Sequence, residues 1–102
     1  MLNFKSEAGY PMVKVLWEDA VTASEAGWTE KDEAMEVATS RLPLMRTVGW
    51  CIHHCSRHIA LTDSMGDNEF GQVTKIPMGN VVVLWELEED PKEPLYTNKE
   101  IL

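Results

Sequence analysis

Hydrophobic and polar residues alternate along the chain in short runs that turn residues separate. In residues 12–19, Val13, Val15 and Trp17 fall on one face and polar residues on the other. This period of two is typical of a strand with one buried face. The same period recurs after residue 45. It predicts five strands, over residues 12–19, 45–54, 58–63, 72–77 and 81–87.

One segment, residues 29–41, follows a helical period instead. Thr29 is followed three residues later by Asp32, which resembles a capping box at the start of a helix. A narrow apolar stripe that includes Ala34 and Val37 continues at helical spacing. We therefore expect one helix, with this stripe lying on the sheet.

The positions of glycine and valine indicate where the strands bend and turn, and which strand faces are covered. Gly49 lies inside the second strand, where the missing side chain permits a tight bend. Gly79 and Asn80 join the last two strands, and such a pair takes positive φ at low cost. The last strand is apolar at Val82 and Leu84 as well as at alternate positions, so both faces should be covered, and a partner subunit could supply that cover. The pattern predicts a mainly β fold: a small, strongly bent five-stranded barrel with one helix.

Composition fits a single domain over residues 1–102, with a core of about 12–87 and an acidic tail over 88–102. Nine basic residues stand against seventeen acidic ones, which gives a formal net charge of −8. Such a charge repels phosphate backbones and anionic membranes, and it counts against nucleic-acid binding by the whole surface.

Targeting and redox signals are weak. The first residues lack the basic-then-apolar order of a signal peptide, and residues 81–85 are too few to span a bilayer. We expect a cytoplasmic protein with no membrane partner. Cys51 and Cys55 would lie roughly 13 Å apart on one strand, too far for a disulfide, so reduced thiols are expected.

Two segments carry a family resemblance. Residues 76–84, IPMGNVVVL, look like the second motif of the Sm and Sm-like (LSm) proteins, and residues 48–61, VGWCIHHCSRHIAL, are similar to the first. The order of strands and turns also resembles this family, which has an SH3-like barrel. A weaker likeness connects the chain with short uncharacterised bacterial and bacteriophage proteins.

The resemblance implies a homo-oligomeric ring in which the fourth strand pairs with a neighbour's fifth strand. The implied interface residues are Val73, Lys75, Val82 and Leu84. Family members bind single-stranded RNA, and the implied contact residues here are His54, Arg57, His58, Gly79 and Asn80. The chain departs from the family in placing its helix between the first and second strands. It also carries Met78 where a basic residue commonly contacts phosphate.

Both cysteines and all three histidines lie within residues 51–58. His54, Cys55 and His58 could converge around a turn on a zinc ion, whose ligands lie about 2.0 to 2.3 Å away. Alternatively these imidazoles line a pore and gain charge as pH falls, or they are ordinary solvated loop residues. We expect no bound metal, no cofactor and no enzymatic activity, because no catalytic motif is present.

The leading hypothesis is a non-enzymatic homo-oligomeric ring that binds single-stranded RNA or a protein partner. The alternative is a structural or adaptor scaffold, with a viral origin as one option, that binds a basic protein and no nucleic acid. A third class, a small metal-dependent enzyme, would rest on the Cys/His cluster. Arg46, Arg57 and Lys75 separate the first two hypotheses, because their gathering at one opening would favour nucleic acid.

Overall fold

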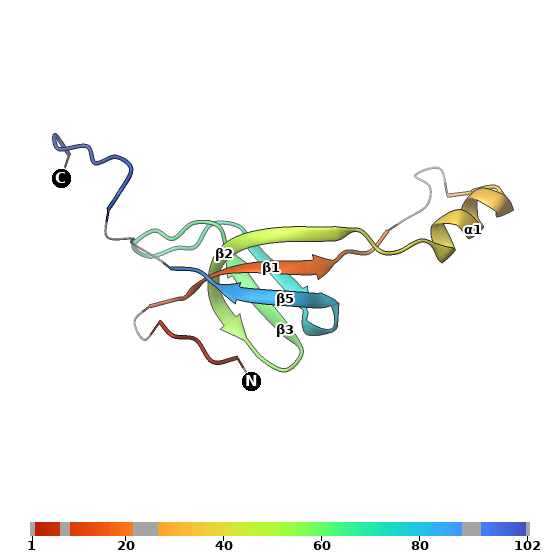
Figure 1. The fold of residues 1–102 in the computed structure, drawn as a ribbon, viewed down its shortest axis with the longest axis horizontal. Coiled ribbons are helices and arrows are strands. Elements are labelled where there is room, and N and C mark those ends of the chain that lie inside the picture. Colours follow the sequence, from red (N-terminus) through yellow and green to blue (C-terminus); the bar gives the residue numbers. More distant parts are fainter. Residues whose placement is uncertain (1, 7–8, 22–26, 89–92, 102) are drawn as a thin grey trace.

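The computed structural model describes residues 2–6, 9–21, 27–88 and 93–101 (Figure 1). The elements in these ranges are β1 (Met12–Glu18), α1 (Lys31–Thr39), β2 (Leu44–His54), β3 (His58–Thr62), β4 (Val73–Pro77), η1 (Met78–Asn80) and β5 (Val81–Glu86). All five predicted strands are present, each within two residues of its expected ends. The mainly β fold with one helix is therefore confirmed.

The strands form one antiparallel sheet in the order β4-β3-β2-β1-β5. β4 and β5 are the outer strands and do not pair with each other, so the sheet is not closed into the expected barrel. Figure 1 shows the long β2 curving from its pairing with β1 toward β3. A Cβ at Gly49 would lie only 2.7 Å from the carbonyl oxygen of Thr62, so β2 and β3 can approach closely only at a glycine.

The core lies on one face of the sheet and draws on β1, β2, β3 and β4. Its buried residues are Val13, Val15, Cys51, Ile59, Leu61 and Ile76. Val13 and Val15 are fully buried, and Trp17 packs against the core, as the alternation in β1 predicts. Cys51 is buried and Cys55 is half-buried, and the two are not joined by a disulfide.

Residues 2–6, before β1, are held against the sheet. The Glu86 carboxylate accepts the backbone N–H groups of Lys5 at 2.5 Å and Ser6 at 2.9 Å. The Phe4 ring contacts the ring of His54 edge-to-face at 5.3 Å between centroids. Leu2 and Phe4 also pack against the core, so this segment covers part of it.

The helix differs from the expectation in length and in position. α1 begins after Glu30, which makes no side-chain cap, and Thr29 does not cap it either. None of its residues is buried, and Figure 1 shows it projecting away from the sheet. The predicted packing on the sheet is wrong, because Ala34 and Val37 offer too little apolar area to hold a helix in place.

The projecting parts make the molecule elongated. Its radius of gyration is 18.5 Å, against about 13 Å for a compact domain of this length. Figure 1 shows α1 at one end and residues 93–101 at the other. Within the described ranges, no helix has the length and hydrophobicity that crossing a bilayer requires.

The connection between β4 and β5 is the 3₁₀ turn η1, and Gly79 within it does not have positive φ. The expectation of a left-handed Gly-Asn turn is wrong at this position. The Asn80 side chain donates its amide N–H to the carbonyl of Glu18 at 2.8 Å. This bond ties the start of β5 to the end of β1 and stabilises the 3₁₀ geometry without a left-handed residue.

Candidate functional site

The candidate site is the end of the β2–β3 hairpin, where Ser56 and Arg57 form the tip. The Cys55 N–H donates to the His58 carbonyl at 3.0 Å and closes the turn. The Met78 N–H donates to the Arg57 carbonyl at 2.8 Å, so η1 braces the tip from outside. The predicted tight loop is present, and it is fixed by backbone hydrogen bonds on two sides.

A bulge in β2 decides which histidines face one another. The β2–β3 ladder is irregular between Cys51 and His53, which leaves Ile52 without an opposite residue. His54 therefore lies opposite the buried Ile59. Because opposite residues share a face of the sheet, His54 lies on the core face and His53 on the outer face.

Three side chains gather on that outer face. The rings of His53 and His58 lie 5.3 Å apart between centroids. The Cys55 sulfur lies 3.6 Å from Nδ1 of His58. Potential ligand atoms of the three residues all lie within 4.8 Å of one another. The structure therefore assembles His53, and not the expected His54, with Cys55 and His58.

His54 has a different environment from the one that the sequence suggested. The sequence suggested that it converges with Cys55 and His58 around the turn, but its ring contacts Phe4 instead. Its Nδ1 is buried without a hydrogen-bond partner among the described residues. The correction follows from the bulge, because an uninterrupted strand would place His54 and His53 on the reverse faces.

The surroundings at the hairpin end lower the pKa values of both Cys55 and His58. Backbone hydrogen bonds from Arg57, and then from His58, lower the pKa of the Cys55 thiol. Partial burial lowers the pKa of His58, and the nearby positive charge of Lys75 adds to the effect. The pair is therefore biased toward the deprotonated forms that can act as electron-pair donors.

Of the basic residues Arg46, Arg57 and Lys75, only the last two lie at the hairpin end. Arg57 and Lys75 lie close enough to His58 to affect its pKa, so both belong to the hairpin end. Arg46 lies opposite Leu16, eight residues before His54, which is about 26 Å along β2. Two of the three basic residues that we used as a test therefore share one place, and the third does not.

The remaining predicted nucleic-acid residues lie in η1. Gly79 is exposed, and a Cβ there would meet nothing within 4 Å. The Asn80 amide is engaged with the Glu18 carbonyl, so this side chain has a structural role in the protomer. Because Met78 bonds to the tip, Gly79 adjoins Arg57.

The open strands carry the predicted interface residues. Asp63 donates its N–H to the carbonyl of Gln72. Hydrogen bonding alternates along an antiparallel ladder, so Val73 and Lys75 direct their backbone groups away from β3. By the same alternation, the bond from the Leu87 N–H to Met12 leaves the backbone groups of Leu84 and Glu86 directed away from β1. These atoms form the two open edges of the sheet.

Exposed apolar side chains lie along both open edges of the sheet. Val73 is 47% exposed on β4, and Val82 is 50% exposed on β5. Val83 and Trp85 are exposed on the outer face of β5 as well. Leu84 packs partly against the core, so it offers the edge its backbone more than its side chain. The two apolar faces of β5 are thus not both covered by the chain itself.

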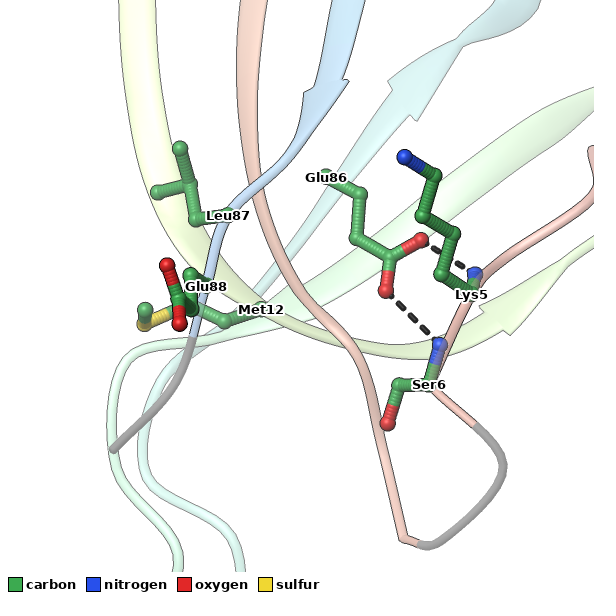
Figure 2. A pocket seen from close by; sticks show the side chains of 6 residues that line it. All are labelled: Lys5, Ser6, Met12, Glu86, Leu87 and Glu88. Carbon is green, nitrogen blue, oxygen red and sulfur yellow. Dashed lines mark hydrogen bonds between the residues drawn. The ribbon is translucent and has the colours of Figure 1, made fainter. Parts of the chain in front are cut away.

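A hollow of about 470 Å³ lies beside the end of β5 (Figure 2). Its lining residues are Lys5, Ser6, Met12, Glu86, Leu87 and Glu88. Figure 2 shows the Glu86 carboxylate turned toward the backbone of Lys5 and Ser6. Both carboxylate oxygens are therefore occupied, and this hollow serves to hold the N-terminal segment.

Sequence reasoning missed His53 and Glu86. The tight loop at Ser56 and Arg57 fixes the pairing of His54 with Ile59, and counting back from the loop would have placed His54 on the same face as Ile59 and His53 on the other. The role of Glu86 depends on two backbone groups about eighty residues away. No local pattern signals such a contact.

Comparison of the chain with protein-family models, with curated proteins and with solved structures found no match. The proposals below therefore rest on the contacts of the chain's own residues.

Proposed function

We propose that the protein is a non-enzymatic scaffold that assembles with itself, β4 of one protomer pairing with β5 of the next. The observation that supports this function is the pair of open edges at the two ends of the strand order. Among the described residues, Val73 and Lys75 have backbone groups without a strand partner on one edge, and Leu84 and Glu86 have them on the other. Such edges are templates for strand addition.

Pairing of two different edges makes a head-to-tail interface. Repetition of this contact produces a ring if the rotation closes, and a filament if it does not. The strong curvature of β2 turns the two edges relative to each other, which favours closure. A ring of this kind is also what the Sm-like resemblance of residues 48–61 and 76–84 implies.

The exposed valines add a hydrophobic contribution to the same contact. Val73 and Val82 each leave about half of their surface exposed in the protomer. Covering half of a valine side chain contributes about 1 kcal/mol. Backbone hydrogen bonds would set the register between β4 and the neighbouring β5. The two valines and Trp85 would supply the apolar surface that the contact removes from water.

Substitution of Val73 by proline tests the edge directly. Its N–H points away from β3, so Val73→Pro removes a donor from the interface and leaves the protomer's own ladder intact. Val73→Ala is the matched control, because it shortens the side chain and keeps the N–H. With size-exclusion chromatography and light scattering, we expect wild type and Val73→Ala to form oligomers and Val73→Pro to be monomeric.

Far-UV circular dichroism must show the same fold for the three proteins. A wild-type protein that is monomeric at micromolar concentration contradicts the proposal. Equal assembly of Val73→Pro and Val73→Ala would show that contacts elsewhere hold the oligomer.

Binding of single-stranded RNA at the hairpin end is a second candidate. Arg57 and Lys75 gather beside His58, and ring formation would repeat this positive charge in every protomer. The net charge of −8 and the engaged amide of Asn80 weigh against it. Fluorescence anisotropy with a uridine-rich strand at low salt tests this candidate, with Arg57→Ala expected to weaken binding. No binding would leave the scaffold role, in which the acidic surface suits a basic protein partner.

A further inference from the structure

The outer face of the β2–β3 hairpin presents one sulfur and two imidazoles at close range. The Cys55 sulfur and Nδ1 of His58 lie 3.6 Å apart, and His53 completes a set whose ligand atoms lie within 4.8 Å. The three residues span only six positions of the sequence. The bulge at Ile52 brings His53 to this face.

These distances suit a tetrahedral metal ion. Bonds of about 2.0–2.1 Å to nitrogen and about 2.3 Å to sulfur place two ligands of one zinc ion roughly 3.6 Å apart. The Cys55–His58 pair already has this separation. His53 needs to approach by about 1 Å, which rotation of an exposed side chain achieves.

The supporting backbone is also suitable. Hydrogen bonds from Cys55 to His58 and from Met78 to Arg57 hold the turn on both sides. A rigid turn reduces the conformational entropy lost on binding. Thiolate and imidazole together select zinc-like ions over magnesium and calcium, which prefer oxygen ligands. The nearby positive charges of Arg57 and Lys75 reduce the affinity that this ligand set would otherwise have.

We propose that His53, Cys55 and His58 bind one Zn²⁺ ion per chain, with the fourth position open to water or to an external ligand. None of the three ligands lies on β4 or β5, the strands whose edges carry the proposed assembly. An ion here would lock the hairpin tip and offer an exposed Lewis acid on the outer face of the sheet.

Cobalt titration tests the site. The full chain is stripped of metal with a chelator, kept reduced, and titrated with Co²⁺ as a coloured substitute for Zn²⁺. We expect tetrahedral ligand-field bands and a thiolate charge-transfer band that saturate at one ion per chain and disappear on addition of Zn²⁺. Cys55→Ser should abolish the charge-transfer band.

His53→Gln and His54→Gln form a matched pair, because the same change is made at neighbouring positions of one strand. We expect His53→Gln to weaken Co²⁺ binding by at least about tenfold and His54→Gln to leave it within about threefold. Similar losses in both variants, or absence of the bands in wild type, would overturn the assignment.

Two further measurements use the wild-type chain. Saturation at half an ion per chain would indicate a metal shared between protomers, and it would overturn the mononuclear site. Alkylation followed by mass spectrometry should show Zn²⁺ protecting Cys55, while the buried Cys51 stays unmodified with or without metal. Unchanged alkylation of Cys55 at saturating Zn²⁺ would overturn the role of its sulfur. One ion per chain requires no pairing of β4 with β5, so the metal site and the proposed assembly can fail separately.

Discussion

Gly49 and Gly79 carry different constraints, although both interrupt β-rich sequence. A Cβ at Gly49 would lie 2.7 Å from the Thr62 carbonyl oxygen, which is backbone and cannot rotate away. We expect Gly49→Ala to lower the free energy of unfolding by about 1–3 kcal/mol. Gly79 has free space and an ordinary φ, so Gly79→Ala should change it by less than about 1 kcal/mol, toward greater stability.

Urea denaturation of the two variants checks this difference. Equal destabilisation by both substitutions would contradict the close approach at Gly49. At the scale of single residues, the sequence indicated both glycines but not the reason for each. The requirement at Gly49 comes from a strand that pairs with β2, and the geometry at Gly79 comes from a 3₁₀ turn that Asn80 stabilises.

The N-terminal segment, residues 2–6, covers part of the core and is held in place by the side chain of Glu86. Glu86→Gln removes the negative charge and one acceptor from the bonds to Lys5 and Ser6. We expect a loss of about 1–2 kcal/mol in the free energy of unfolding and faster amide exchange in residues 2–6. Glu88→Gln, in the same hollow, is the control and should have no comparable effect. The same loss in both variants would show that the total charge matters and the bonds do not.

Elements differ in how well a sequence predicts them. Alternation placed β1 to β4, each of which carries a buried residue, and a continuous apolar run placed β5. The bulge at Ile52 depends on pairing with β3, and the projection of α1 depends on how little apolar area its residues offer. Such outcomes are settled by contacts between elements. For that reason the candidate site contains His53 in place of the expected His54, while Cys55 and His58 were predicted.

At the scale of the whole molecule, shape and charge act together. α1 and residues 93–101 extend from the sheet and leave large apolar side chains exposed, among them Met35 at 59% and Tyr96 at 78%. The sequence does not predict this exposure, because an amphipathic pattern does not show which surface will cover its apolar side. The absence of pairing between β4 and β5 is likewise a long-range property, and it is the one on which the proposed assembly depends.

Salt concentration distinguishes the two proposed functions. Protomers with a charge of −8 repel one another, and salt screens that repulsion over a Debye length of about 10 Å at 0.1 M. We expect self-association, measured by sedimentation velocity, to strengthen several-fold between about 50 mM and about 500 mM salt. RNA binding has the reverse dependence, because it releases counterions. Self-association that weakens with salt would indicate that ion pairs, and not edge hydrogen bonds with apolar cover, hold the protomers together.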